Sequence, residues 1–374
     1  MTALEQALRA DIRHRLENEE FRYTDNSFAF IRLRDREAME RDREYLALWG
    51  APAFDEFCAR NADALRCQVE RCSFLYGVLE DEYSRRTLVT RIAYLLLGHL
   101  FVKFDHYPPG YFETLDTLDR ELAVEGHPDF TANEHVDEFG IGDPLVLYDL
   151  SRAGLAARFY STPLMLYALL RDKPYRYAHG RTLVEVARGD YVFDCGAAFC
   201  DTALSFSLQA GGEGRIFSYD PNPFMEHVGR FNLGLNGPCG ERVRFFGLGV
   251  TNRVSDGVKL FVYGQGSTID KGTDVGLPST TIRTSTIDHE VRRNGIPKVD
   301  FIKMDIEGSE LAALAGAMKT LHAFRPKLAI SVYHQPDDLY AIPKFIHELG
   351  LGYKLYLEHH SPIIYETILY AMAE

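Results

Sequence analysis

The chain has 374 residues, of which 46% are hydrophobic and 25% charged, and its formal net charge at pH 7 is −13. This length exceeds what one hydrophobic core usually serves, so we expect two domains. The negative charge would repel nucleic acid and anionic membrane surfaces, and no basic stretch with interleaved aromatic residues offsets it. We therefore expect neither nucleic acid nor a membrane as a partner.

Cysteine spacing and the first residues indicate a cytoplasmic protein. The six cysteines form neither a C-x-x-C pair nor the ladder of a secreted scaffold, so we expect reduced thiols. The opening MTALEQALRAD contains acids and lacks a long apolar core, which argues against a signal peptide. The most apolar segment, 92–102, is too short to span a bilayer.

The N-terminal part of the chain shows helical patterning. Apolar residues recur at helical spacing in segments 3–20, 54–79 and 84–104, which predicts a mainly helical N-terminal domain over 1–144. The last part of that domain, 105–143, contains the turns PPG and GHP with a helix expected between them. Such a segment is typical of a linker or an active-site flap.

From residue 145 to residue 374, strand-like and helix-like runs alternate, which predicts an α/β domain with a mostly parallel sheet and helices on both faces. The expected strands lie near 191–194, 215–219, 243–248, 300–304, 327–333, 353–357 and 366–371, with helices after the first, second, fourth and fifth. Ligands bind beyond the carboxyl ends of such strands, so Asp194, Asp220, Asp305 and His334, which all end strands, should meet in one crevice.

The stretch 191–208, YVFDCGAAFCDTALSFSL, is a buried strand that turns through small residues into a helix. Gly196, Ala197 and Ala198 let a ligand approach the backbone, and Thr202 opens a helix with free N–H groups. Asp220, at the end of the next strand, suits a ribose diol. This pattern alone leaves a nicotinamide cofactor, S-adenosylmethionine and ordinary helix–sheet packing open.

Two details favour S-adenosylmethionine. Ala198 and Cys200 break the G-x-G-x-x-G pattern of dinucleotide sites. The carboxylate of Asp194 is expected to pair with the ammonium of a methionine moiety, whereas it would repel a pyrophosphate.

An ordered series of motifs resembles the FkbM-type S-adenosylmethionine-dependent methyltransferases. The series is DxGA…DTAL at 194–204, YDPNP at 219–223, Asn232 and Asn236, STID at 285–288, DFIKMDIEGSE at 300–310, PKLAISVYH at 326–334 and ETILYA at 366–371. The family usually has glycine where this chain has Cys200. The resemblance implies a Rossmann-like class I methyltransferase sheet over 145–374 and S-adenosylmethionine as the cofactor. The cofactor-binding residues are then expected to be Asp194, Gly196, Ala197, Asp201, Thr202, Asp220 and Asn222.

Three residues are candidates for catalysis. Asp305 ends the fourth strand, where a carboxylate can stabilise the sulfonium or orient an acceptor hydroxyl. Glu307 is either a helix cap or a site residue, and Glu310 is expected only to cap. His334 ends the fifth strand, and its neutral imidazole is our first candidate for the base that accepts the hydroxyl proton; the alternative is a structural histidine.

The sequence also contains ligand types for a metal and two further histidines. Asp288, Asp305, Glu307 and His334 include the ligand types for a hard divalent cation, but their spacing is not diagnostic and we expect no metal. His359 and His360 follow the next strand. Adjacent strand residues point opposite ways, so at most one of these two should line the pocket.

These observations predict an O-methyltransferase that acts on a hydroxyl of a small molecule, which the resemblance makes a sugar, a glycan precursor or a specialised metabolite. One alternative is a non-catalytic S-adenosylmethionine-binding or assembly protein, with which Cys200 is compatible. Another is a nicotinamide-dependent oxidoreductase, which Ala198 and Cys200 disfavour. A nucleic-acid methyltransferase is disfavoured because 305–308 reads DIEG where an Asn/Asp-Pro-Pro-aromatic loop would be expected.

Overall fold

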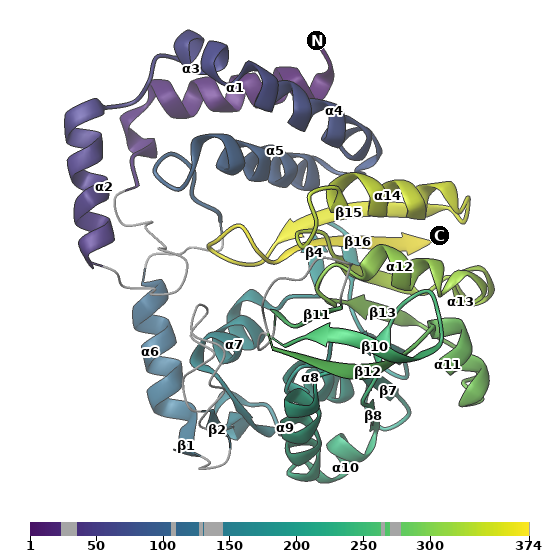
Figure 1. Ribbon diagram of the computed structural model, residues 1–374. Helices are drawn as coiled ribbons and strands as arrows, with labels where there is room; N and C mark the ends of the chain where they lie inside the picture. Colours follow the sequence, from purple (N-terminus) through teal and green to yellow (C-terminus); the bar gives the residue numbers. More distant parts are fainter. Residues whose placement is uncertain are drawn as a thin grey trace.

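The computed structural model describes residues 1–23, 36–105, 110–126, 130, 145–262, 266–269 and 278–373. Its centre is a seven-stranded sheet in the order β15-β16-β14-β13-β6-β7-β8 (Figure 1). The strands are β6 (Tyr191–Cys195), β7 (Arg215–Tyr219), β8 (Val243–Phe246), β13 (Phe301–Met304), β14 (Lys327–Ser331), β15 (Tyr353–His359) and β16 (Thr367–Ala373). The strands from β14 to β8 run parallel, and β16 is antiparallel to both of its neighbours. The predicted mixed α/β class and the seven predicted strand positions are confirmed.

Alternate residues of the central strands pack against different helices. Val192 contacts a cluster that includes Phe206 of α8, whereas Phe193 belongs to a cluster that includes Leu314 of α12. The helices on the first face are α8 (Asp201–Ala210), α9 (Pro223–Gly234) and α10 (Gly237–Glu241). Those on the second face are α11 (Ile287–Arg293), α12 (Glu310–Ala315), α13 (Met318–Phe324) and α14 (Asp338–Glu348). This two-residue alternation explains why these strands are nearly continuous apolar runs in the sequence.

The strand order reverses between β6 and β13. From β6 the chain proceeds through β7 to β8 on one side, and then returns to build β13 and β14 on the other side of β6. The backbones meet closely at the carboxyl ends of this pair: the Asp305 N–H donates to Cys195 O over 3.0 Å. A Cβ atom on Gly196, whose φ is +85°, would overlap the carbonyl oxygen of Asp305. Open α/β sheets bind ligands at such a reversal.

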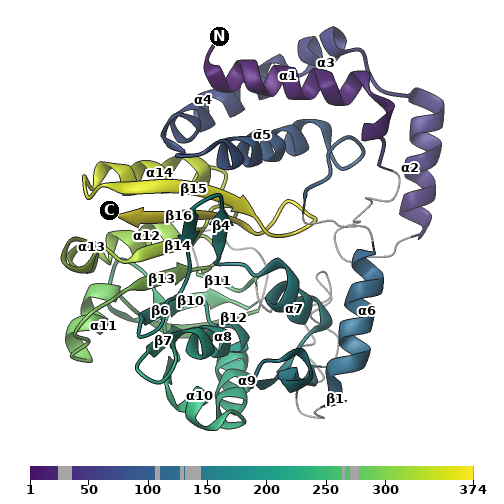
Figure 2. The same cartoon turned by 180° about the vertical axis from the view of Figure 1, so that it is seen from behind.

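The N-terminal helices are α1 (Ala3–Glu17), η1 (Glu19–Phe21), α2 (Arg36–Trp49), α3 (Phe54–Arg60), α4 (Ala62–Val78) and α5 (Glu82–Leu97). The last of these helices, α5, packs against β15 at the edge of the sheet, and α1 packs on α4 and α5, as the two views in Figures 1 and 2 show. The Glu80 N–H donates to Leu355 O of β15 over 3.0 Å. Residues of α1, α4 and α5 share one hydrophobic cluster with β13 to β15, so helices and sheet have a continuous core. The structure thus has helices in the predicted segments 3–20, 54–79 and 84–104. No described helix is long and apolar enough to cross a membrane.

Short elements surround this core. The helix expected between the PPG and GHP turns is α6 (Tyr111–Leu122), while 106–109, 127–129 and 131–144 of the expected flap lie outside the described residues. The others are β1 (Ala123–Gly126), β2 (Val146–Asp149), η3 (Leu150–Ala153), β3 (Arg158–Ser161), α7 (Pro163–Tyr167), the π-helix η4 (Ala168–Asp172), β4 (Tyr177–His179) and β5 (Thr182–Val184). A four-stranded sheet that the sequence did not predict comprises β9 (Gly249–Val250), β10 (Ser255–Phe261), β11 (Thr268–Ile269) and β12 (Ser279–Ser285).

Two asparagines one helical turn apart fasten α9 to β3. Asn232, which is fully buried, accepts a hydrogen bond from Tyr160 N and donates to Tyr160 O and Phe199 O at 2.7–2.9 Å. Asn236 repeats the pattern with the N–H and C=O of Arg158. The amide side chains therefore make the hydrogen bonds to the backbone of β3 that a neighbouring strand would make. Asn232 also binds the carbonyl oxygen of Phe199, the residue before Cys200.

We predict that Asn232→Ala lowers the free energy of unfolding by about 2–4 kcal/mol, because it leaves buried backbone groups of Tyr160 and Phe199 without partners. Asn236→Ala, at a half-buried position, is the matched control and should cost less. Urea denaturation of both variants measures the difference; equal losses would contradict this role of Asn232.

Candidate active site

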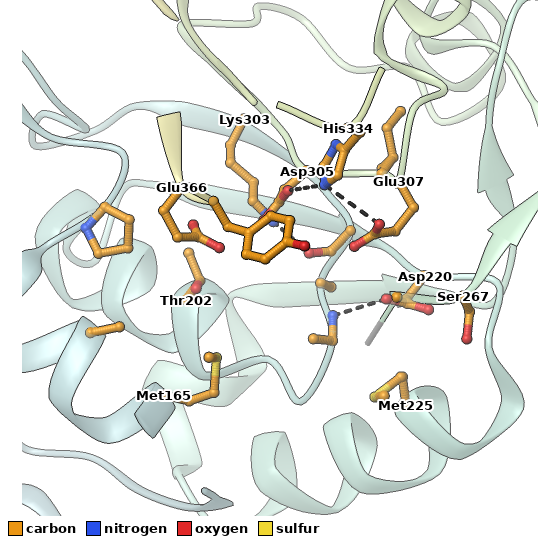
Figure 3. Close-up of a pocket in the computed structure, with 18 of the residues that line it drawn as sticks. Met165, Thr202, Asp220, Met225, Ser267, Lys303, Asp305, Glu307, His334 and Glu366 are labelled. Carbon is orange, nitrogen blue, oxygen red and sulfur yellow. Dashed lines mark hydrogen bonds and ion pairs between the residues drawn. The ribbon is translucent and has the colours of Figure 1, made fainter. Parts of the chain in front are cut away.

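A cavity of about 330 Å³ opens at the carboxyl ends of β6, β7, β13 and β14 (Figure 3). Nine of the ten predicted site residues line it: Gly196, Ala197, Asp201, Thr202, Asp220, Asn222, Asp305, Glu307 and His334. The exception is Asp194. Figure 3 shows Asp220 and Ser267 in one part of the cavity, and Lys303, Asp305, His334 and Glu366 in another.

Backbone amides fix the Asp220 carboxylate at the cavity wall. One oxygen accepts from Ala198 N and the other from Asn222 N, both at 2.9 Å. The Asn222 side chain accepts from Phe224 N and so caps α9, and it donates to Ser267, which also lines the cavity. Burial, opposed by these hydrogen bonds, raises the pKa of Asp220 to about 6. A fixed carboxylate at the end of β7 has the chemistry that a ribose diol requires.

Asp194 lies beneath the turn and pairs with a cation of the protein. Lys303 is its register partner on β13, and Lys303 Nζ lies 3.2 Å from Asp194 Oδ1. Ser218 donates to the other oxygen over 3.0 Å, and Lys303 also donates to Gly196 O. The carboxylate expected to meet a methionine ammonium is thus already neutralised by Lys303, and a direct contact with the ligand stays a prediction.

Cys200 occupies a backbone conformation that favours glycine. Its φ is +61° and its ψ +17°, in the left-handed region, which explains why the family usually has glycine here. The buried thiol fills space beside Gly229, where an added Cβ would lie 2.9 Å from the Cys200 sulfur. Burial also raises the pKa of the thiol well above its usual value, so it is protonated and unreactive.

We predict that Cys200→Gly keeps affinity for S-adenosylmethionine within about tenfold, or about 1.4 kcal/mol, because the thiol is not among the side chains that line the cavity and glycine readily adopts the same left-handed conformation. Cys200→Ala is the control that keeps the strain and loses the sulfur. Calorimetric titration measures both variants; complete loss of binding in the glycine variant alone would assign the thiol a direct role.

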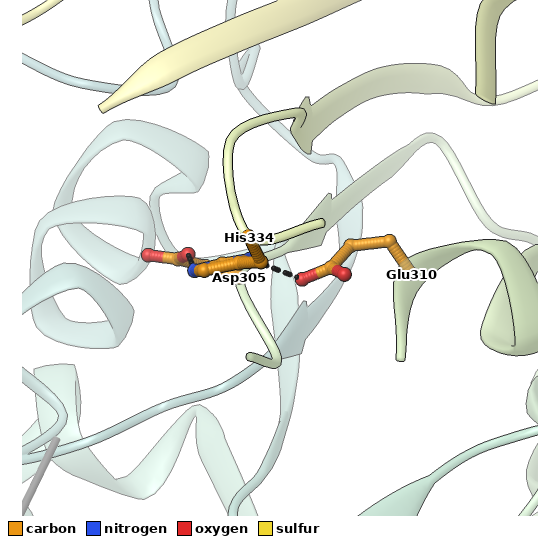
Figure 4. A group of neighbouring side chains, drawn as sticks. All are labelled: Asp305, Glu310 and His334. Atoms are coloured by element: carbon orange, nitrogen blue, oxygen red, sulfur yellow. Dashed lines mark hydrogen bonds and ion pairs between the residues drawn. The ribbon is translucent and has the colours of Figure 1, made fainter. Parts of the chain in front are cut away.

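His334 is held between carboxylates on both of its ring nitrogens. Nδ1 lies 2.9 Å from Glu310 Oε1, and Nε2 lies 3.4 Å from Asp305 Oδ1 and 3.5 Å from Glu307 Oε2 (Figures 3 and 4). Burial opposes the charged ring, but the hydrogen bonds and charges of Glu307 and Glu310 raise the pKa of His334 well above its usual value. The neutral imidazole expected near pH 7 does not fit these surroundings, which stabilise an imidazolium.

Glu310 does more than the expected capping. Its Oε1 accepts from Ile306 N over 2.9 Å, which closes the turn before α12, and the same oxygen holds the His334 ring. The expectation that Glu310 only caps is therefore corrected. The sequence did not show this second contact because it joins residues that follow two different strands.

Asp305 is held by two phenols. Tyr175 donates to its Oδ2 over 2.7 Å, and the Tyr333 hydroxyl lies 3.1 Å from its Oδ1. Burial opposes ionisation, but the charges of His334 and Lys303 hold the pKa of Asp305 below its usual value. Asp305 is therefore an ionised, fixed acceptor on the cavity wall.

Sequence reasoning missed Tyr175 and Glu366. Both line the cavity, and the Glu366 carboxyl lies 3.0 Å from the Tyr333 hydroxyl. Tyr175, Glu307 and Glu366 have φ values of +67°, +53° and +64°, which are strained for residues with a side chain. Such strain concentrates at functional sites. The only sequence signal was the position of Glu366 at the start of ETILYA.

Among the described residues, Asp305, Glu310 and His334 are close enough to suggest a metal group. The two ring nitrogens of His334 face opposite ways, with Glu310 at one and Asp305 at the other, so one ion cannot replace both contacts (Figure 4). Asp288, the fourth ligand type considered, instead accepts from the N–H groups of Lys319 and Thr320 at the start of α13. The expectation that there is no metal stays a prediction.

The rest of the cavity wall is largely apolar. It includes side chains from α6, α7, η4 and the segment before β16, namely Tyr111, Leu164, Met165, Leu169, Ile363 and Tyr365. His360 lines this part and His359 does not, as strand alternation predicts.

Comparisons with known proteins show what this part of the chain is similar to. Residues 194–355 match the family described as the Methyltransferase FkbM domain. Over these residues the chain is therefore similar to FkbM methyltransferases. Its structure is similar to that of methyltransferase FkbM from Methylobacillus flagellatus KT, with a TM-score of 0.51 and 20% identity over 89% of this chain and 70% of that chain. Fibrillarin from Aeropyrum pernix, solved with S-adenosyl-L-methionine, gives a TM-score of 0.34 and 14% identity over 67% of this chain and 99% of that one. No curated protein matches the chain.

S-adenosylmethionine is the cofactor of this FkbM-type domain, and the cavity fits it. Gly196, Ala197 and Ala198 leave the backbone accessible, and the Asp220 carboxylate can accept from hydroxyl groups. Apolar side chains that suit an adenine ring also line the cavity: Met225, Val250, Leu260 and Ile269.

We predict that Asp220→Ala weakens S-adenosylmethionine binding by about 1.5–3 kcal/mol, the range for a lost hydrogen bond to a charged group. Wild-type affinity should fall as pH decreases through about 6, because protonated Asp220 accepts the ribose hydroxyls less well. Asp220→Asn, which cannot titrate, should show no such fall. Calorimetry between pH 5 and pH 8 checks this, and identical pH profiles would remove Asp220 from the site.

Proposed function

We propose that this methyltransferase transfers a methyl group to a hydroxyl oxygen of a small molecule. The observation that supports this most directly is that one cavity joins the glycine turn after β6 to the Asp305–His334 cluster. A cofactor held by the turn and an acceptor held by the cluster would therefore meet in a water-poor space.

In this proposal the cofactor supplies a methyl group carried on a sulfonium. Gly196 and Ala197 let the cofactor approach the backbone, Thr202 contacts its polar atoms at the start of α8, and Asp220 binds the ribose hydroxyls. Asp201 and Asn222 complete the contacts from the start of α8 and of α9. Asp194 acts from beneath the turn through Lys303, which holds Gly196 O.

Asp305, Glu307 and His334 are the proposed catalytic groups. Asp305 accepts the acceptor hydroxyl's hydrogen bond, since Tyr175 and Tyr333 fix its position. The His334 imidazolium, held by Glu310, donates toward the acceptor, and Glu307 balances its charge. Oriented groups of this kind stabilise charge where it changes during transfer.

The apolar wall favours an acceptor with an apolar body. A free sugar needs hydrogen-bond partners for several hydroxyls, whereas the wall formed by Leu164, Met165, Leu169 and Ile363 offers none from its side chains. We therefore place a hydroxylated specialised metabolite ahead of a sugar or glycan precursor as the acceptor.

We also propose the division into a helical domain, 1–144, and a Rossmann-like class I methyltransferase domain, 145–374, in a cytoplasmic protein. Tyr111 of α6 lines the cavity, so the first domain contributes to the acceptor wall.

A screen of hydroxylated metabolites and sugars with isotopically labelled S-adenosylmethionine tests the activity. We predict that His334→Ala binds the cofactor normally but lowers turnover by about 10²–10³, the cost of removing one oriented donor. His322→Ala, at an exposed position on α13, is the control. Near-normal turnover of His334→Ala would make this residue structural. Cofactor binding without transfer to any acceptor would favour the non-catalytic alternative.

A further inference from the structure

We propose that Glu366, and not His334, takes the proton of the acceptor hydroxyl, and that the positive charge of the bound cofactor prepares Glu366 for this by favouring its ionised form. This inference rests on the proposed function, because it assigns the proton of that same reaction.

The Tyr333 hydroxyl contacts two carboxyl groups, and the number of protons available to these contacts shows which carboxyl group is protonated. Its hydroxyl lies 3.1 Å from Asp305 Oδ1 and 3.0 Å from Glu366 Oε1. A phenol has one proton, so both contacts are hydrogen bonds only when one of the two carboxyl groups is protonated and donates to the phenol oxygen. Asp305 is ionised, since it accepts from Tyr175 and faces His334. The proton therefore belongs to Glu366.

The Glu366 carboxyl group can lose its proton at a pH near neutrality. Burial, and then the nearby charge of Asp305, raise the pKa of Glu366 to about 8. A base works best when its pKa lies near the working pH. His334 cannot serve, because Glu307 and Glu310 stabilise its charged form.

Glu366 is positioned to reach an acceptor in the cavity. Glu366 lines the cavity directly before β16, and its carbonyl oxygen accepts from His360 N over 2.9 Å, which fixes a backbone with φ of +64°. The ionisable groups that act on Glu366 come from several elements: Asp305 and Glu307 after β13, Tyr333 and His334 after β14, Tyr175 before β4, and Tyr370 on β16.

Charge couples Glu366 to the reaction. A positive charge in the cavity lowers the pKa of a nearby carboxyl group, and loss of that charge raises it again. During transfer, the bond from the acceptor oxygen to the methyl carbon forms as the carbon–sulfur bond breaks. The electron pair of the broken bond stays on sulfur, now a neutral thioether, and the hydroxyl proton passes to the Glu366 carboxylate. Glu366 thus becomes a stronger base as the positive charge disappears.

The experiment needs no acceptor. S-adenosylmethionine carries the sulfonium charge and S-adenosylhomocysteine does not, so calorimetric titration with each at pH 8, in buffers of different ionisation enthalpy, reports the protons released on binding. Both ligands have an α-amino group that also titrates, so the result is the difference between the wild type and Glu366→Gln. We expect the wild type to release an additional fraction of a proton with S-adenosylmethionine only.

The same coupling appears in affinity. The ratio of S-adenosylmethionine to S-adenosylhomocysteine affinity should rise by about tenfold more in the wild type than in Glu366→Gln between pH 6 and pH 9, which corresponds to a shift of about one pKa unit. Asp220 contacts the part that both ligands share, so its titration cancels in this ratio. Equal proton release in the wild type and Glu366→Gln, with a parallel pH dependence, would overturn the proposal.

Two controls keep the outcomes distinct. Unchanged S-adenosylhomocysteine affinity shows that Glu366→Gln is folded, and Glu366→Asp, which keeps a titrating carboxyl group, should retain the proton release. With an acceptor from the screen, Glu366→Gln should lose about 10²–10⁴ in turnover together with the rise of the rate toward pH 8, whereas His334→Ala should keep that rise. Failure of the proposed function has another signature, namely normal proton release with no methyl transfer.

Discussion

The site depends on the close approach of two backbones where the strand order reverses. Because Gly196 has no side chain, the end of β6 can lie against the carbonyl of Asp305, and Asp305 N in turn donates to Cys195 O. Lys303 strengthens the junction by bonding both Asp194 and Gly196 O. The turn proposed to hold the cofactor and the turn proposed to hold the acceptor are therefore joined directly by backbone and side-chain contacts.

Burying so many charges at this junction requires that they be paired. The carboxylates outnumber the cations: Lys303 pairs with Asp194 and also acts on Asp305, while His334 lies beside Asp305, Glu307 and Glu310. Holding like charges close together in a low-dielectric space is costly unless one group gives up its charge. Glu366, whose carboxyl group is enclosed beside Asp305, is the group that does so. Its protonation follows from the ion pairs around it.

The sequence predicted the features that depend on local pattern. Short apolar runs located the strands, and a carboxylate at the end of the second run identified Asp220. What it missed depends on tertiary contact. The pairing of Asp194 with Lys303 follows from strand register, and Tyr175 and Glu366 reach the cavity from segments with no local signal of their own. The β9 to β12 sheet was missed because two of its strands have two residues each, too few to show a period.

Most described residues with a strained backbone lie at the cavity. Among the described residues other than glycine that have positive φ, four line the cavity, namely Tyr175, Ala198, Glu307 and Glu366, and Cys200 is adjacent to them. Each such conformation costs on the order of 1 kcal/mol or more and persists only where surrounding contacts enforce it. At Glu307 and Glu366 the strained backbone directs a carboxyl group into the cavity. There the carboxyl group can take part in the proposed reaction. At Cys200 no such benefit is present, because the thiol packs against Gly229. Cys200 is therefore the position in the site where glycine would relieve strain without removing a polar contact.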